Sequence, residues 1–297
     1  MDHYLLETIK RTTDYIEDHL LAEDLCLDQI ARQVNVSKFH LLRIWKGATA
    51  TGIMEYVRRR RIAESLGDLL KPVSGIAWIA DKYGFGSERS YNRVFKEEFG
   101  CTPGRWRKTP SPLNILDRFN ADFMSTAGEG LVFFRSVRIL PAFSLAGPEY
   151  RIDAGDNQLN GTAVKCGVDF FFNQRLDIIG PVRKNVYYGF TSVPEPEDGY
   201  SFYQPSLQID QTSIIPSYMK QRQVQPHKYG VFTYIGTHRP EELSPQALES
   251  IWNVVFNRWM PTVRMELREK FSFEYLDYSK CSRQYCECDF YYPITWL

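Results

Sequence analysis

Apolar residues recur at helical spacing in two segments that lie fifty residues apart. In residues 37–46, and again in residues 87–96, they occupy the fifth, eighth and ninth positions. Spacings of three and four place such residues on one face of a helix. Ser37 and Ser87 begin the two segments and are predicted N-caps, because a serine hydroxyl can accept a hydrogen bond from a free backbone N–H. The pattern predicts two helices of the same design.

A shorter helical pattern precedes each of these segments, over residues 27–34 and 76–83. The residues that follow are Asn35 and Gly84, and both types adopt the positive φ that a tight turn between helices requires. A helix, a short turn and a second helix form the helix-turn-helix arrangement. The sequence therefore predicts two helix-turn-helix units.

Basic residues are concentrated in the same part of the chain, although the formal net charge of the whole is zero. Residues 25–110 hold 16 Lys and Arg against 8 Asp and Glu. A basic segment between acidic neighbours is typical of a nucleic-acid-binding module. Residues 53–70 are predicted to form one helix that links the two units, and this helix contains the four-arginine run 58–61.

The outward positions of the two second helices form matched sets of side chains. Arginine can bond a guanine edge through two donors, and asparagine can bond adenine. Any one of these side chains could be an ordinary surface residue, but the shared register of two helices favours DNA contact. The predicted DNA-binding residues are Lys38, Phe39, Leu42, Arg43, Lys46, Glu88, Arg89, Asn92, Arg93 and Lys96.

Residues 8–110 resemble the DNA-binding domain of the AraC/XylS transcription regulators. The resemblance depends on Ile79-Ala80, Tyr83-Gly84-Phe85, Ser87, Arg93, Phe95-Lys96, Gly100, Thr102-Pro103 and Trp106-Arg107. It implies recognition helices that enter successive major-groove segments on one face of the DNA, and RNA polymerase as a partner. The base-reading positions that it implies are Phe39, Leu42, Arg43, Glu88, Arg89 and Arg93. Because the two sets differ, we expect a binding site without palindromic symmetry.

The second half of the chain has a different pattern, with short runs rich in aromatic and β-branched residues. Residues 111–130, which hold Ser, Pro, Thr and Gly, suggest a linker with some helical content around 113–124. Helices are predicted near 163–175 and after Ser244, with Pro245 at the first helical position. Two rounds of strands with one helix each suggest a duplicated α+β domain. The predicted strands are 131–139, 185–193, 203–209, 229–235, 271–277 and 288–294.

This half resembles the GyrI-like effector-binding domain over residues 135–297. The matching pieces are Pro141-Ala142-Phe143 to Gly147, Tyr187-Tyr188-Gly189-Phe190, the run 229–236, Phe273-Glu274 and Tyr291-Tyr292-Pro293-Ile294. The resemblance implies two pseudo-symmetric halves with a ligand groove between them, and a glutamate that points into the groove. Glu274 matches that glutamate. Leu276 stands where the family has a tyrosine, and Tyr275 and Tyr278 are the candidates to replace it.

A carboxylate near aromatic rings suits an organic cation, through charge and cation–π attraction. A solvent-facing glutamate on a strand is the alternative, and core packing is the alternative for each aromatic residue. The predicted effector-binding residues are Glu274, Tyr188, Phe190, Tyr234, Trp252 and Trp259.

Other kinds of site find little support. Cys281, Cys286 and Cys288 fit no common zinc spacing and have no histidine nearby, so no metal site is predicted. The sequence contains no Gly-rich phosphate loop, nucleophile elbow or Ser/His/Asp set, so no cofactor or catalytic residue is predicted. The sequence has no recognisable signal peptide and no apolar run long enough for a membrane span. The scattered cysteines suggest reduced thiols and a cytoplasmic protein without membrane partners.

The sequence therefore predicts a multidomain protein. An all-α double helix-turn-helix domain spans 1–110, a linker spans 111–134, and a duplicated α+β GyrI-like domain spans 135–297. The predicted function is sequence-specific DNA binding by a transcription regulator, not an enzyme, whose second domain binds an aromatic or cationic small molecule. Two alternatives for the second domain stay open. One is a hydrolase of a reactive toxic compound, since a glutamate near a tyrosine can activate water; the other is a protein-interaction module.

Overall fold

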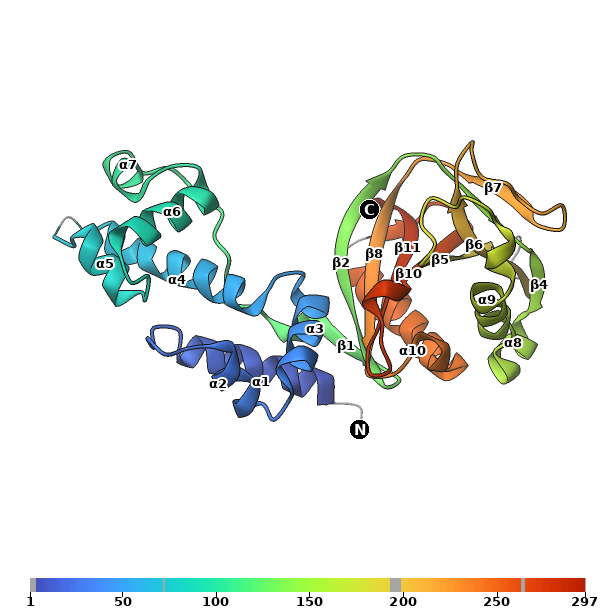
Figure 1. Ribbon diagram of the computed structural model, residues 1–297, viewed down its shortest axis with the longest axis horizontal. Coiled ribbons are helices and arrows are strands. Elements are labelled where there is room, and N and C mark those ends of the chain that lie inside the picture. The colour runs from blue at the N-terminus through green and yellow to red at the C-terminus, as the bar shows by residue number, and fades with distance from the viewer. Residues whose placement is uncertain (1–3, 72, 193–198, 263–264, 297) are drawn as a thin grey trace. The chain divides into compact units, whose positions relative to one another are not determined.

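The computed structural model describes residues 4–71, 73–192, 199–262 and 265–296. Val193, the last residue of a predicted strand, lies outside them. The chain divides into a helical unit, Leu6–Ala121, and a sheet unit that contains Asp122–Leu297 (Figure 1). This division falls inside the predicted linker.

Short helices build the helical unit. They are α1 (Tyr4–Asp18), α2 (Leu27–Gln33), α3 (Lys38–Thr49), α4 (Ile53–Leu69), α5 (Ile76–Lys82), α6 (Glu88–Phe99) and α7 (Pro103–Lys108). Helices α2–α3 form the first helix-turn-helix and α5–α6 the second, with Asn35 and Gly84 at φ values of 56° and 69°. Ser37 accepts a hydrogen bond from the backbone of His40 at 3.3 Å, and Ser87 from that of Ser90 at 3.1 Å. The predicted caps and turns are therefore present.

Helix α4 contributes to two separate apolar cores. Its first half adds Ile53 and Val57 to the core of the first helix-turn-helix, which contains Trp45. Its second half adds Ile62 and Leu69 to the core of the second, around Tyr91 and Phe95. Each helix-turn-helix therefore packs on its own end of one continuous helix.

The arginine run of α4 is largely structural. Arg60 and Arg61 are buried, and only Arg58 of the four is fully exposed. The Arg61 guanidinium donates to the carbonyls of Leu20 at 2.7 Å and Ala22 at 2.9 Å, ahead of the first helix-turn-helix. It also donates to the carbonyl of Gly84 at 3.1 Å, in the turn of the second. One side chain thus connects both units to the linking helix.

Gly84 is fitted closely to Arg61. Its φ is positive, and a Cβ added there would lie 2.7 Å from the Arg61 Nη1 atom. The positive φ therefore favours glycine, and any side chain at this position would have to displace the guanidinium of Arg61.

The predicted helical content of residues 113–124 is wrong. Residues 111–120 contain no helix, a 3₁₀ turn follows at Ala121–Phe123, and strand β1 begins at Met124. Leu113 packs on the second core, whereas Leu116 and Phe119 pack on the first. These three apolar residues thus belong to a segment without regular secondary structure that reaches two different cores.

One antiparallel sheet forms the sheet unit. Its strands are β1 (Met124–Ala127), β2 (Gly130–Leu140), β3 (Phe143–Gly147), β4 (Tyr150–Asp153), β5 (Val186–Ser192), β6 (Tyr200–Ile209), β7 (Lys220–Val224), β8 (His227–Gly236), β9 (Met265–Leu267), β10 (Phe271–Asp277) and β11 (Cys286–Trp296). The order is β1-β2-β8-β11-β10-β5-β6-β3-β7, with β4 beside β6 and β9 beside β11.

The helices of this unit are α8 (Ala154–Asn160), α9 (Thr162–Phe172), α10 (Pro245–Val254) and α11 (Met260–Thr262), with a π-helical turn at Val255–Trp259 between the last two. Short 3₁₀ turns lie at Gln174–Asp177, Pro240–Glu242 and Tyr278–Lys280. Ser244 caps α10, as expected, by accepting from the Ala247 amide at 3.1 Å.

The predicted duplication is confirmed by the strand order. The series β8-β11-β10 mirrors β3-β6-β5, and the halves meet where β10 pairs with β5. In each half a strand is followed by a helix, α9 or α10, and then by two more strands. Residues of both helices join one core with the sheet, so both helices cover the same face, here called the helix side.

We predict that Arg61→Met destabilises the helical unit by roughly 2–4 kcal/mol, because three backbone carbonyls lose a charged donor. Arg58→Met serves as the matched control, because this neighbouring arginine is exposed and its loss should cost less than about 0.5 kcal/mol. Urea unfolding followed by circular dichroism measures both. Equal effects of the two substitutions would contradict the role assigned to Arg61.

Candidate functional site

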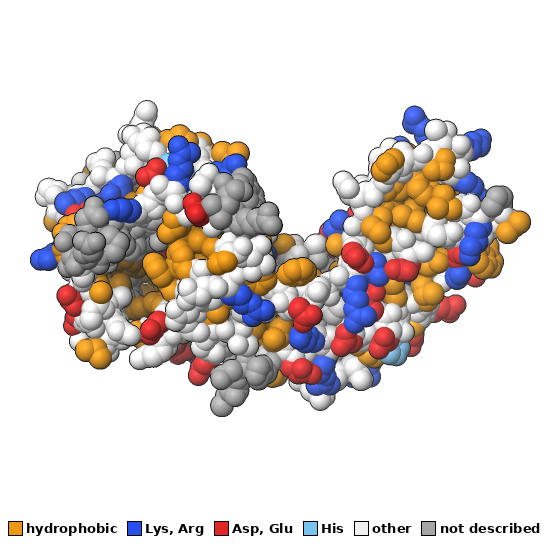
Figure 2. Space-filling view, turned by 180° about the vertical axis from the view of Figure 1, so that it is seen from behind, with side chains coloured by type: hydrophobic (Ala, Val, Ile, Leu, Met, Phe, Trp, Pro, Cys, Tyr) orange, Lys and Arg blue, Asp and Glu red, His pale blue; other side chains and the backbone are white. Residues whose placement is uncertain are grey.

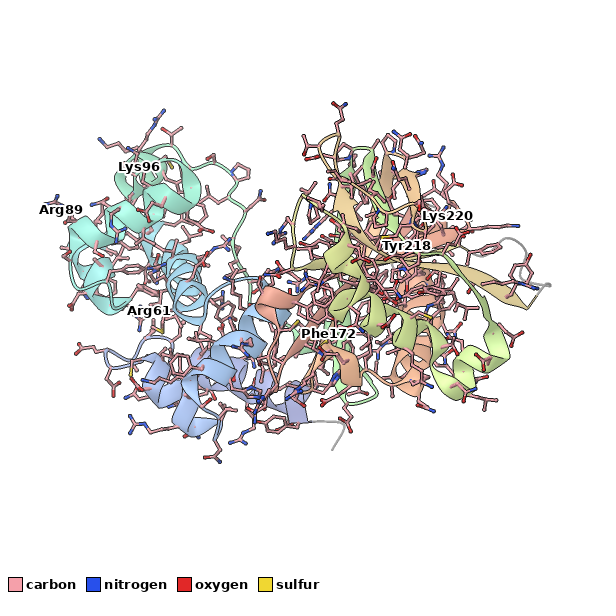
Figure 3. The ribbon with its side chains drawn as sticks, turned by 45° about the vertical axis from the view of Figure 1, so that its right-hand side comes forward. Arg61, Arg89, Lys96, Phe172, Tyr218 and Lys220 are labelled. Carbon is pink, nitrogen blue, oxygen red and sulfur yellow. The ribbon has the colours of Figure 1, made fainter. Side chains whose placement is uncertain are left out.

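The predicted DNA-binding residues lie on the outer faces of α3 and α6. Nine of the ten are exposed, and Asn92 is half-buried. Figure 3 shows Arg89 and Lys96 on the outside of α6, whereas Arg61 lies within the helical unit. Phe39 is 82% exposed, and a phenylalanine this exposed suits a surface that a partner covers.

Two of these side chains form ion pairs, and both pairs are exposed to solvent. Lys38 pairs with Asp28 at 2.7 Å and Arg93 with Glu97 at 3.0 Å, and all four side chains are exposed. Such pairs contribute little to stability, so both cations can exchange their partner for a phosphate or a base. Hydrophobic and basic side chains also lie next to each other on the face of the helical unit seen in Figure 2.

Glu274 lies on the helix side at the centre of the sheet. Strand register places it opposite Gly189 of β5 and opposite Phe290 of β11. A Cβ on Gly189 would lie 2.6 Å from the Glu274 carboxylate, so this glycine makes room for the charged group. The Glu274 side chain is half-buried, and it therefore keeps some surface for a ligand.

Two tyrosines that the sequence analysis did not single out as effector contacts surround the carboxylate. The hydroxyl of Tyr203 forms a hydrogen bond with Glu274, and the hydroxyls of Tyr203 and Tyr187 bond to each other. Gly167 of α9 lies against both, since a Cβ there would be 2.5 Å from the Tyr187 hydroxyl. Tyr203 belonged to a predicted strand, but only the pairing of β5, β6 and β10 brings it to Glu274.

Burial sets the protonation of this cluster. Loss of water around the carboxylate raises the pKa of Glu274 from 4.5 to about 7, against the effect of the Tyr203 hydrogen bond. Burial also raises the pKa of Tyr187 and of Tyr203 well above the ordinary value, so both stay neutral donors. Among the described residues, no lysine or arginine contributes to the shift at Glu274. The carboxylate thus lacks a cationic partner.

Tyr188 and Phe190 lie on the opposite side of the sheet from Glu274. They are paired in register with Tyr275 and Phe273, and these four residues join a second apolar cluster. Because side chains alternate along a strand, they cannot share a surface with Glu274.

Neither candidate replacement for the missing tyrosine reaches the carboxylate. Tyr275 lies on the opposite side and accepts a hydrogen bond from Arg183 at 2.8 Å. Tyr278 stacks on Phe171 with the ring centroids 3.6 Å apart. The hydroxyl at Glu274 comes instead from Tyr203.

The remaining predicted aromatics take different positions on the helix side. Tyr234 is fully buried and bonds His238 at 2.8 Å, and Trp259 is 5% exposed in the core. Trp252 is 48% exposed. Its ring centroid lies 4.4 Å from that of Phe256, and the ring centroid of Phe256 lies 5.2 Å from that of Tyr292. Of these three, Trp252 has the surface that a ligand could contact.

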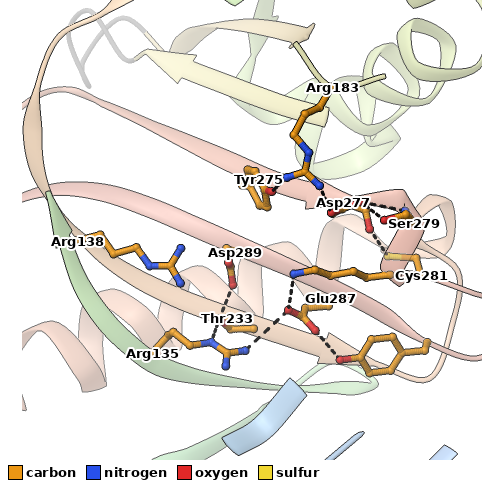
Figure 4. Close-up of polar contacts among 12 residues, drawn as sticks. Arg135, Arg138, Arg183, Thr233, Tyr275, Asp277, Ser279, Cys281, Glu287 and Asp289 are labelled. Atoms are coloured by element: carbon orange, nitrogen blue, oxygen red, sulfur yellow. Dashed lines mark hydrogen bonds and ion pairs between the residues drawn. The ribbon is translucent and has the colours of Figure 1, made fainter. Parts of the chain in front are cut away.

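Charged residues cover part of the opposite side and pair with one another (Figure 4). Arg183 bonds Asp277 at 2.7 Å, and Arg135 bonds Thr233, which in turn donates to Asp289. These cations are therefore engaged away from Glu274.

Known proteins divide the chain in the same way. A helix-turn-helix family model matches residues 30–109, and a family of integron-associated effector binding proteins matches residues 137–294, more than half of the chain. The multiple antibiotic resistance protein MarA of Escherichia coli is 33% identical over 102 residues, 34% of this chain and 80% of MarA. The chain is an AraC-type DNA-binding transcription regulator with a Cass2-type C-terminal domain.

Two solved structures are similar to the C-terminal domain of the regulator. The integron cassette protein VCH_CASS2 of Vibrio cholerae has 17% identity and a TM-score of 0.39, covering 55% of this chain and 99% of that one. SAV2435, solved with bound tetraphenylphosphonium, has 15% identity and a TM-score of 0.39, and the match covers 54% of this chain and 93% of SAV2435. Within the described residues of the regulator, every helix is too short or too polar to cross a bilayer, and no cluster suits a metal ion.

We predict that Arg93→Ala weakens specific DNA binding by about 1–3 kcal/mol and relaxes the preference at one base pair, because a bidentate base contact is lost. Gel shifts measure this on DNA selected by the wild type from random sequences. Arg283→Ala is the control, since Arg283 is an exposed arginine of the sheet unit. Unchanged affinity and preference for Arg93→Ala would remove Arg93 from the interface.

We also predict that Glu274→Gln stabilises the ligand-free protein at high pH. The folded-state pKa of Glu274 is raised, so wild-type stability falls as the pH rises from 4.5 toward about 7. The substitution removes this loss, so the variant should be more stable by roughly 2 kcal/mol at about pH 8 and no more stable at about pH 4. Thermal unfolding at both pH values is the measurement. No gain at either pH would show that the carboxylate is well solvated, and a gain independent of pH would show that removal of the charge is not its cause.

Proposed function

We propose that the regulator senses an organic cation at Glu274 and binds operator DNA through α3 and α6. The observation that carries this proposal is a half-buried carboxylate that lacks a cationic partner among the described residues. Removing a carboxylate from water is costly unless a charge or hydrogen bonds compensate for it. A bound cation would supply that charge.

Aromatic rings near Glu274 favour a cation that is also lipophilic. Tyr187, Tyr203 and Tyr292 are electrostatically coupled to the carboxylate. The ring contacts from Tyr292 through Phe256 extend to the exposed Trp252. Rings of this kind attract a cation over their faces, by about 0.5–2 kcal/mol each. Charge and ring contacts thus favour the same class of ligand.

On the DNA side, we propose that one chain reads two unlike half-sites. Phe39, Leu42 and Arg43 would contact one segment of the major groove, and Glu88, Arg89 and Arg93 the next. Helix α4 and Arg61 connect the two reading helices within one chain, so a second chain is not required for two contacts. RNA polymerase is a proposed partner on the family resemblance alone.

We predict that Glu274→Gln weakens binding of tetraphenylphosphonium by at least tenfold, which is about 1.4 kcal/mol, and leaves binding of neutral triphenylphosphine oxide nearly unchanged. Wild-type affinity for the cation should rise as the pH passes through about 7, the pKa of Glu274, and the variant should not show this rise. Isothermal titration calorimetry measures all of these affinities.

Glu266→Gln is the control for this titration, because Glu266 is an exposed glutamate of the same domain. It should bind both compounds like the wild type. Equal losses for the two compounds in Glu274→Gln would mean that Glu274 supports the fold and does not select charge. No loss for either compound would place the ligand elsewhere.

Hydrolysis is the second candidate function, and the pKa of Glu274 favours it. A carboxylate that titrates at about 7 beside neutral tyrosine hydroxyls has the properties of a general base that activates water. The experiment follows an aryl epoxide by NMR in the presence of the regulator. Repeated conversion to the diol that stops in Glu274→Gln would establish catalysis, whereas binding without conversion supports sensing.

A further inference from the structure

Two cysteines face each other at the junction between β10 and β11. Cys281 follows the 3₁₀ turn Tyr278–Lys280 and is half-buried, whereas Cys286 begins β11 and is buried. Both are free thiols. Neither the proposed DNA interface nor the proposed cation site uses them.

A tight turn brings the two cysteines together. Ser282 and Tyr285 form an antiparallel bridge, in which the Ser282 amide donates to the Tyr285 carbonyl at 2.9 Å and the reverse bond is 3.4 Å long. Continued by one residue on each strand, this register sets Cys281 opposite Cys286. Next to a doubly hydrogen-bonded pair, opposed residues have Cα atoms about 4.5 Å apart and side chains on the same face. A disulfide needs about 4.4–6.8 Å between Cα atoms, so the backbone suits one.

The two sulfurs interact already in the reduced protein. The proximity of Cys286 lowers the pKa of Cys281, and that of Cys281 raises the pKa of Cys286. In the reduced protein the Cys281 thiol also donates to the carbonyl of Asp277 at 3.6 Å. A thiolate is the reactive form of cysteine. Cys281, the more accessible of the two, is also the one whose thiolate is favoured.

Cys288 has no such partner. It is two residues from Cys286 along β11, about 6.6 Å between Cα atoms at the usual rise of a strand, which is near the upper limit for a disulfide and longer than the distance of about 4.5 Å expected for the cross-strand pair. It is buried like Cys286. It therefore provides a matched control.

We propose that Cys281 and Cys286 are a redox modification site at which a hydroperoxide converts the pair to an intramolecular disulfide. The Cys281 thiolate attacks one peroxide oxygen, the O–O bond breaks, and the leaving alkoxide or hydroxide takes up a proton. The resulting Cys281 sulfenic acid is attacked by the Cys286 sulfur; the S–O bond breaks, and water leaves with the Cys286 proton. Two thiols are oxidised and one hydroperoxide is reduced to an alcohol and water.

The bond would join the segment just after the 3₁₀ turn that follows β10, the strand that carries Glu274, to the start of β11. Its formation does not depend on the proposed function, because the chemistry requires only the turn and the two thiols.

The test treats the reduced full-length protein with hydrogen peroxide and then alkylates the remaining thiols. The expected result is that two of the six cysteines escape alkylation, and that peptide mass spectrometry finds Cys281 linked to Cys286, reversibly with dithiothreitol. All six thiols remaining, or a disulfide between other cysteines, would overturn the proposal. This measurement on the wild type needs no variant.

Single serine variants test the order of the two steps. Cys286→Ser should stop at a sulfenic acid on Cys281 that dimedone traps, and Cys281→Ser should leave Cys286 reduced because it is buried. Cys288→Ser should form the disulfide like the wild type. Disulfide formation that requires Cys288, or dimedone labelling of Cys286 in Cys281→Ser, would contradict the assignment.

Discussion

The buried guanidinium of Arg61 is the interaction on which the DNA-binding half depends. It satisfies three backbone carbonyls, two in the segment ahead of the first helix-turn-helix and one in the turn of the second. A buried cation is tolerated only when its donors are bonded, so the segments that supply the carbonyls must stay in place around α4. The two apolar cores at the ends of α4 add packing, but Arg61 bonds both units at once. The spacing of the two reading helices follows from that connection.

In the sheet unit the corresponding constraint is the carboxylate of Glu274. The sheet places it at the seam between the two halves, where β10 pairs with β5. Glycines at 189 and 167 leave room for the carboxylate and for the tyrosine hydroxyls next to it. The protein has therefore kept small residues around a group whose burial is unfavourable. Such an arrangement is expected of a functional site, since an apolar side chain could fill the same space in the fold without the free-energy cost of burying a carboxylate.

The two sides of the sheet differ in chemistry for a simple reason. Neighbouring residues of a strand point to opposite faces, so Glu274 and Tyr275 belong to different environments although they are adjacent. On the opposite side, arginines are paired with carboxylates and tyrosines. On the helix side, a tyrosine hydroxyl is the one hydrogen-bond partner of the carboxylate among the residues that the structure describes. The arginines Arg138 and Arg183 thus lie on the side where they cannot neutralise Glu274.

The local pattern of the sequence determined both helix-turn-helix units, because apolar spacing, serine caps and the residues of a tight turn act within a few positions of each other. It also placed Glu274 on the opposite face from Phe273 through strand alternation. Only the tertiary structure decided that Arg60 and Arg61 are buried while Arg58 is exposed, and that residues 113–119 extend across two cores. The same holds for Tyr203, which replaces the tyrosine expected near Glu274. Each of these outcomes depends on contacts between segments far apart in the chain, and such contacts leave no periodic signal in the sequence of either segment.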